Sequence, residues 1–112
     1  MNDCLFCKIV AGEIPSSKVY EDDVCYAFND IAPQAPTHFL GVPKAHIGSG
    51  AEVTADNSSV VAHIFEVIAK LTKEQGLTSY RVVSNIGEQA GQSVFHLHFH
   101  VLAGRDMTWP PG

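Results

Sequence analysis

The sequence predicts a single α+β domain with five short strands, one long helix and one short helix. Five segments rich in β-branched and aromatic residues are separated by turn residues. One longer stretch carries apolar residues at helical spacing. The chain has 112 residues, of which 46% are hydrophobic and 17% charged, a balance that suffices for one core and does not suggest disorder. We therefore treat residues 1–112 as one domain.

The chain begins with a predicted short helix at residues 4–11. Asp3 is the expected N-terminal cap, and Gly12 stands just beyond the last turn, where glycine favours helix ends. Two strands follow, at residues 19–20 and 24–28, and the acidic turn between them predicts a hairpin.

Two prolines in residues 31–37 remove backbone donors and predict an extended loop. The next strand is expected at residues 38–42. The long helix begins at Asn57 or Ser58 and ends before Gly76. Its apolar positions recur every three or four residues at Val60, Val61, Ile64, Ile68 and Leu71.

The last third of the chain contains two further predicted strands, at residues 80–84 and 95–102. A glycine-containing loop at residues 87–91 lies between them. The proline-rich residues 105–112 are expected to form a tail without regular structure.

The charge balance argues against a nucleic-acid partner. Seven basic and twelve acidic residues give a formal charge of −5, without a Lys/Arg cluster. Binding of a nucleic-acid polymer depends on many basic phosphate contacts, whereas backbone amides suffice for a single phosphate.

The start of the chain carries no basic segment, and the apolar runs are too short to span a bilayer. Three cysteines, an odd number, favour a reducing compartment, and we expect a soluble cytoplasmic protein without a membrane partner.

The predicted final strand carries three histidines, His96, His98 and His100, at every second position. Alternate strand residues share a face, so the three imidazoles are expected in a row, with apolar residues facing the helix. Two chemistries suit such a row: a metal site, and nucleophilic and acid–base catalysis by imidazole. The preceding Gly91-Gln92-Ser93 can offer backbone and hydroxyl donors to a phosphate, and no carboxylate adjoins the histidines in the sequence. This context favours imidazole catalysis on a phosphate ester or amide.

The segment 91–102 resembles the signature of the histidine triad (HIT) superfamily, in which three histidines alternate with apolar residues. Further similar segments are Glu13-Ile14-Pro15, Ala27-Phe28, Asp30-Ile31, residues 33–39 and Pro43-Lys44. The ending Trp109-Pro110-Pro111-Gly112 is similar to that of the Hint branch, the histidine triad nucleotide-binding proteins. The resemblance covers nearly the whole chain.

The resemblance implies a HIT-like fold with a five-stranded antiparallel sheet, and a homodimer whose sheets join into one of ten strands. It implies hydrolysis of purine nucleoside phosphoramidates, with AMP or GMP as the bound nucleotide. His98 would be the nucleophile and form a nucleotidyl-histidine. His100 and His96 would donate to the phosphate, and Ser93 and His38 would contact the leaving group or supply it with a proton. Two alternatives stay open: a nucleotide-binding regulatory module and a dinucleoside polyphosphate hydrolase, although the C-terminal ending argues against the latter.

The resemblance also implies nucleotide contacts. Asp30 would bind the ribose hydroxyls, although an Asn-Asp pair also suits a turn. Asn29 stands where many relatives carry histidine. The base slot would be formed by Phe6, Ile9, Ile14 and Ile31, although a residue of this kind, taken singly, is more often part of a core. The phosphate would lie near Asn85, Gly91, Gln92, Ser93 and Val94, with His98 and His100 beside it.

Some HIT proteins hold a structural zinc ion through two cysteines and two histidines. The matching positions are Cys4, Cys7, His46 and His96. Cys4 and Cys7 are three residues apart, a spacing that places both thiols on one side of a helix. The alternative is that both cysteines are small buried hydrophobes. His63, on the long helix, is assigned to neither site.

Overall fold

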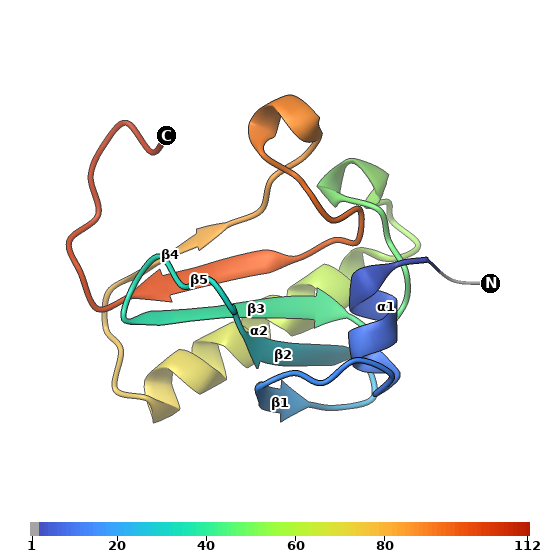
Figure 1. The fold of residues 1–112 in the computed structure, drawn as a ribbon, viewed down its shortest axis with the longest axis horizontal. Helices are drawn as coiled ribbons and strands as arrows, with labels where there is room; N and C mark the ends of the chain where they lie inside the picture. The colour runs from blue at the N-terminus through green and yellow to red at the C-terminus, as the bar shows by residue number, and fades with distance from the viewer. Residues whose placement is uncertain (1–2) are drawn as a thin grey trace.

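The computed structural model describes residues 3–112, and within them five antiparallel strands form one sheet in the order β1-β2-β3-β5-β4. The strands are β1 (Lys18–Glu21), β2 (Cys25–Asn29), β3 (Thr37–Pro43), β4 (Tyr80–Val83) and β5 (Phe99–Ala103). Figure 1 shows them side by side, with the long helix behind the sheet. The expected five-stranded antiparallel α+β fold is confirmed.

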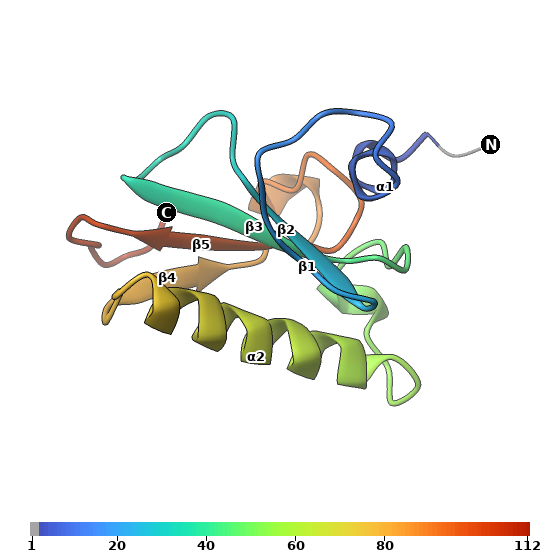
Figure 2. The same ribbon diagram turned by 90° about the horizontal axis from the view of Figure 1, so that it is seen from below.

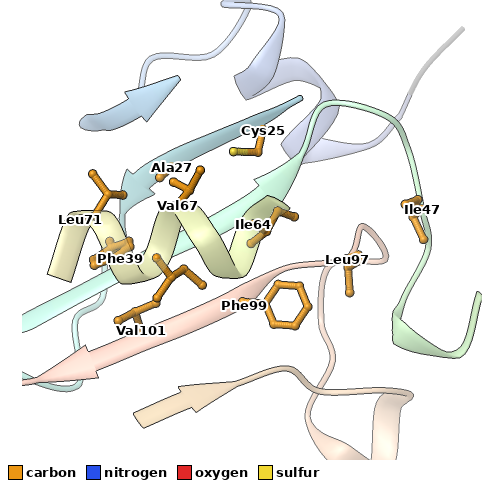
Figure 3. Close-up of a cluster of buried hydrophobic side chains, with 11 residues drawn as sticks. Cys25, Ala27, Phe39, Ile47, Ile64, Val67, Leu71, Leu97, Phe99 and Val101 are labelled. Atoms are coloured by element: carbon orange, nitrogen blue, oxygen red, sulfur yellow. The ribbon is translucent and has the colours of Figure 1, made fainter. Parts of the chain in front are cut away.

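The long helix α2 (Ser58–Glu74) packs on one face of the sheet (Figure 2). Its residues Ile64, Val67, Ile68 and Leu71 are buried against side chains from the central strands (Figure 3). Leu97, Phe99 and Val101 join this core, as their alternation with the histidines predicted. Burial of this apolar face provides most of the free energy that holds α2 on the sheet.

The short helix α1 (Leu5–Val10) lies on the opposite face of the sheet (Figure 2). Phe6 and Ile9 pack there on a second cluster that includes Phe28, Leu40 and Val42. The expected cap of this helix was wrong: Cys4, not Asp3, is the N-cap residue. Its Sγ atom accepts a hydrogen bond from the amide of Cys7 at 3.3 Å.

The last strand is shorter than predicted, because β5 begins at Phe99 rather than at residue 95. Its pairing with β3 ends where Phe99 lies opposite Gly41. The amide of Leu97 instead donates to the carbonyl of Ile47, at 2.6 Å, in the loop that follows β3. His96 and His98 thus precede the strand, and the expected row of three histidines on one strand face is wrong.

A hydrogen-bonded cluster joins α2 to the turn between β1 and β2. The Asp22 carboxylate accepts from the amides of Val24 and Cys25, at 2.8 and 2.9 Å, and from the Tyr20 hydroxyl at 2.8 Å. His63 of α2 contacts the same carboxylate through Nε2, at 2.6 Å. His63 therefore has a partner in the fold that its position in the sequence did not indicate.

The tail at residues 105–112 has no regular secondary structure, as expected. It is tied to the sheet by the Arg81 guanidinium, which donates to the carbonyl of Thr108 at 3.0 Å. Within residues 3–112, no helix is long and apolar enough to cross a membrane.

Candidate active site

His98 has its ring fixed by a backbone carbonyl. The Nδ1 atom lies 2.7 Å from the carbonyl oxygen of His96. Because a carbonyl only accepts hydrogen bonds, the neutral ring carries its proton on Nδ1, and Nε2 keeps a free lone pair. The Ser84 hydroxyl holds the backbone here by donating to the carbonyl of His98 at 2.8 Å. His98 is thus oriented as a nucleophile requires.

His100 is fixed by a chain of hydrogen bonds that begins at a backbone amide. The amide of Gln34 donates to Nδ1 of His38 at 3.0 Å, which leaves the His38 proton on Nε2. That Nε2–H donates to Nδ1 of His100, 2.9 Å away. The remaining proton of His100 is therefore on Nε2. The rings of His98 and His100 lie 5.0 Å apart, so one phosphate group can contact both.

Burial lowers the pKa of His100 to about 4, and the neighbouring His98 and His38 act in the same direction. The ring is therefore neutral near pH 7, and donates to a phosphate through Nε2–H alone. A lowered histidine pKa also affects stability. As the pH falls below about 6.5, the ordinary histidine pKa, the unfolded chain binds a proton at this position. The folded protein binds that proton only near pH 4, so the unfolded state is favoured between these two values.

We expect the free energy of unfolding to fall as the pH decreases from about 6.5 to about 4, and His100→Gln to reduce that fall. Denaturant unfolding of both proteins across this window measures the difference. An equal loss in the two proteins would assign the pH dependence to other groups.

The two histidines line a pocket of about 420 Å³ between α1 and the loops that precede β5, a size that suits a small ligand. Asp30 places its carboxylate there, 3.4 Å from Nε2 of His38. Gly91 adopts a positive φ of 96°, which glycine tolerates best. The lining residues are Leu5, Phe6, Ile9, Phe28, Asp30, Ile31, Leu40, Asn85, Gly91, Ser93, Val94, His98 and His100.

Most of the residues expected at a nucleotide thus line one pocket, but three lie elsewhere. Ile14 packs on the apolar cluster beneath α1. Asn29 donates through its side-chain amide to the Ser17 hydroxyl. The side chain of Gln92 is buried, accepting from the amide of Gly87 and donating to the carbonyls of Gly48 and Val94, so it braces the loop.

The structure adds pocket residues that the sequence did not indicate. Leu5, Phe28 and Leu40 come from α1 and the middle strands, and only the packing of α1 on the sheet brings them to the pocket. The alternation of buried and exposed residues along a strand could have indicated Phe28 and Leu40.

Two histidines expected to contact substrate do not line this pocket. His38 is buried, and its Nε2 contacts His100, so it acts on the pocket through that ring. His96 is fully buried, and its Nε2–H donates to the carbonyl of Pro43 at 2.8 Å. The other nitrogen, Nδ1, faces the thiols of Cys4 and Cys7. Both ring nitrogens of His96 are therefore occupied, and its expected role as a phosphate donor is wrong.

The side chains of Cys4, Cys7, His46 and His96 converge at the N-terminus of α1, and their ligand atoms all lie within 4.8 Å of one another. Nδ1 of His96 lies 3.2 Å from Sγ of Cys4 and 3.4 Å from Sγ of Cys7. Nδ1 of His46 is 3.4 Å from Sγ of Cys7. Ligands around a tetrahedral zinc ion are separated by roughly 3.3–3.8 Å. The Pro43 carbonyl gives His96 the second hydrogen bond that metal-binding histidines usually make, so this cluster fits zinc.

This fold and this pair of oriented histidines define a protein of the histidine triad class. The family model described as "Scavenger mRNA decapping enzyme C-term binding" matches residues 3–109. An uncharacterized HIT-like protein of Synechococcus elongatus is 47% identical over 111 residues, which cover 98% of this chain and 97% of that protein. The chain belongs to the HIT superfamily.

Two solved structures of HIT proteins are similar along nearly their whole length. A HIT family hydrolase from Legionella pneumophila is 50% identical, with a TM-score of 0.96, over 98% of this chain and 100% of that one. A histidine triad protein from Clostridium difficile is also 50% identical, with a TM-score of 0.92 and 96% of both chains covered. The fold described here is therefore the HIT fold.

Proposed function

We propose that this protein is a purine nucleoside phosphoramidase of the Hint type that works through a nucleotidyl-histidine at His98. The observation that carries the proposal is the fixed tautomer of His98, whose Nε2 lone pair is available beside a pocket that suits a nucleotide. The relatives solved as HIT family hydrolases support a hydrolytic reaction. AMP and GMP are the nucleotides that we expect to bind.

In the first step, Nε2 of His98 attacks the α-phosphorus, an N–P bond forms and the P–N bond to the amine breaks. The Ser93 hydroxyl, which lines the pocket, passes a solvent proton to the departing amine. The imidazolium that results is stabilised by its Nδ1–H bond to the His96 carbonyl. His100 donates to the phosphoryl oxygens, which gain negative charge in the transition state.

In the second step, water attacks the phosphorus and the N–P bond to His98 breaks. The nucleoside monophosphate leaves, the extra proton returns to solvent and the ring is neutral again. The Asp30 carboxylate lines the pocket and can accept hydrogen bonds from both ribose hydroxyls. Leu5, Phe6 and Ile9 of the α1 segment provide the apolar surface for the base.

The test is incubation with an adenosine phosphoramidate, followed by measurement of released AMP and by mass spectrometry of the acid-sensitive adduct after rapid quenching. We expect AMP release and an adenylyl group on the peptide that contains His98. A protein that binds AMP but releases none from the phosphoramidate would contradict the proposal and favour a nucleotide-binding module.

We propose that the cluster of Cys4, Cys7, His46 and His96 holds a structural zinc ion. Four protein ligands close the coordination sphere, which supplies folding energy rather than a catalytic water. Thiolate ligands require a reducing compartment, and we propose that the protein works in the cytoplasm.

Elemental analysis of protein purified without chelator should find about one zinc ion per chain. The double variant Cys4→Ser/Cys7→Ser should lose the ion, whereas Cys25→Ala, which removes the third thiol, should retain it. Zinc-free wild-type protein with both thiols reactive would contradict this assignment.

We propose that two copies pair through the β4 edge into a ten-stranded sheet. The other edge, β1, carries Lys18 and Glu21 and an irregular register, features that protect an edge from pairing. Tyr80 of β4 is 39% exposed, and Phe65 of α2, whose ring contacts Phe99 of the neighbouring strand β5, is 45% exposed. This apolar edge favours a second copy as its partner.

Light scattering should give the mass of a dimer for the wild type and of a monomer for Phe65→Glu. Phe95→Glu is the matched control, because Phe95 is 50% exposed but precedes β5 and is not among the residues that pair with β4. A monomeric wild type, or a dimer insensitive to Phe65→Glu, would overturn the proposed interface.

A further inference from the structure

His96 is held at every polar atom of its side chain. The residue is fully buried, Nε2–H donates to the Pro43 carbonyl at 2.8 Å, and Nδ1 lies 3.2 Å from Sγ of Cys4 and 3.4 Å from Sγ of Cys7. The His46 ring packs edge-on at 5.1 Å. A ring constrained in this way also fixes the peptide to which it is attached.

The carbonyl of that same residue orients the candidate nucleophile, since Nδ1 of His98 lies 2.7 Å from it. The segment 96–98 precedes β5, so the sheet's hydrogen bonds do not fix it. Its position depends instead on three anchors: the His96 ring, the amide of Leu97 bonded to Ile47, and the carbonyl of His98 bonded to Ser84. The Leu97 amide and the His96 carbonyl belong to one planar peptide unit, so two anchors act on the peptide whose carbonyl contacts His98. Both lead back to the thiol cluster, since the His96 ring contacts Cys4 and Cys7 and the acceptor residue Ile47 follows His46 in the chain.

We infer that His96 is a positioning residue that couples the Cys4–Cys7–His46 cluster to catalysis: with a metal ion bound, the cluster holds the His96 carbonyl where it fixes the reactive tautomer of His98. The metal takes no part in the reaction. The site that appears structural therefore controls the fraction of molecules in which Nε2 of His98 presents a lone pair. The part of this inference that concerns turnover rests on the proposed phosphoramidase function, whereas the part that concerns the tautomer does not.

The cluster also contacts the pocket through helix α1. A change transmitted through α1 and one transmitted through the His96 carbonyl predict different effects on KM and kcat. Cys4 caps α1, and the Phe6 ring of that helix contacts the rings of His96 and His98, with centroids 6.0 and 5.0 Å apart. Loosening α1 alone would disturb the wall that holds the base and raise KM. Loss of the His96 carbonyl would lower kcat, because fewer molecules carry the reactive tautomer.

The experiment compares wild-type protein as purified, stripped by a chelator and reloaded with Zn²⁺. At one fixed pH, ¹⁵N NMR of the histidine rings reports which nitrogen of His98 carries the proton. We expect a single Nδ1–H tautomer with metal and a mixture without it. With an adenosine phosphoramidate, we expect kcat to fall roughly tenfold to hundredfold on stripping, with KM changed less than kcat, and both to recover on reloading.

Two variants separate coupling from a loss of folding. Cys7→Ser should reproduce the stripped protein, and Cys7→His, which restores a metal ligand, should recover both the tautomer and kcat. Cys25→Ala is the matched control, because Cys25 lies in the core beneath α2, outside the cluster (Figure 3). If Cys7→Ser does not fold, the stripped and reloaded wild type carries the comparison.

The inference is overturned if the protein binds no Zn²⁺, if the His98 tautomer is the same with and without metal, or if stripping raises KM alone. A protein that shows the expected change of tautomer but hydrolyses no phosphoramidate would contradict the proposed function but not the coupling between the cluster and His98. Failure of the proposed function is thus distinguishable from failure of the coupling.

Discussion

His98→Ala is expected to lower kcat/KM for an adenosine phosphoramidate at least about a thousandfold and to abolish the nucleotidyl adduct. Removal of a nucleophile eliminates the covalent route, and the remaining groups can only hold the substrate for slow attack by water. The Asp30 carboxylate and the apolar wall of the pocket remain, so AMP binding should change much less than turnover. Steady-state kinetics, quenched-adduct mass spectrometry and AMP titration measure the three quantities.

His63→Gln is the matched control for that experiment, because His63 contacts Asp22 on the far face of the sheet and should leave turnover intact. His98→Ala with near-normal turnover would show that another group attacks the phosphorus. His100→Gln separates the roles of the two rings: it should lower kcat but retain the adduct at His98, since His100 acts on the phosphoryl oxygens.

Asp22→Ala is expected to lower the free energy of unfolding by about 3 kcal/mol. The carboxylate accepts from two backbone amides, the Tyr20 hydroxyl and His63, so its removal leaves donors from the β1–β2 turn and α2 without an acceptor. Denaturant unfolding at pH 7 measures the loss. Because the cluster lies on the α2 side of the sheet, kcat of the folded variant should stay near that of the wild type.

Asp23→Ala is the matched control, because it removes the same charge from the next, exposed residue and should cost less than about 0.5 kcal/mol. Equal losses in the two variants would show that charge, rather than the hydrogen bonds, matters at this turn.

The Asp22 contribution should also depend on pH. Burial alone raises the pKa of Asp22. The hydrogen bonds from His63 and from the amides of Cys25 and Val24 lower it by more, so the pKa lies well below its ordinary value. A carboxyl group with a lowered pKa stabilises the fold above its ordinary pKa of about 4. That advantage is lost as the pH falls below this value, because the unfolded chain binds the proton first. The difference between wild type and Asp22→Ala should therefore shrink in acid.

The fold class could be predicted from local patterns in the sequence, and most residues of the candidate site from the resemblance to a known family. The helical spacing at Ile64, Ile68 and Leu71 predicted the face that α2 buries, and alternation at Leu97, Phe99 and Val101 predicted the side chains that meet it. The triad and Asp30, with most of the other expected contacts, were recognisable from the resemblance to HIT proteins.

The resemblance already implied different roles for the three histidines, and only the tertiary structure shows how each ring is held. Alternation predicted three equivalent rings on one strand, but β5 begins at Phe99, so His96 turns into the thiol cluster while His98 and His100 face the pocket. The tautomers of His98 and His100 depend on a carbonyl two residues away and on the amide of Gln34, and the partner of His63 is 41 residues distant. Sequence patterns report which residues share a face, whereas the protonated nitrogen of a histidine is set by the partner that folding brings to the other nitrogen.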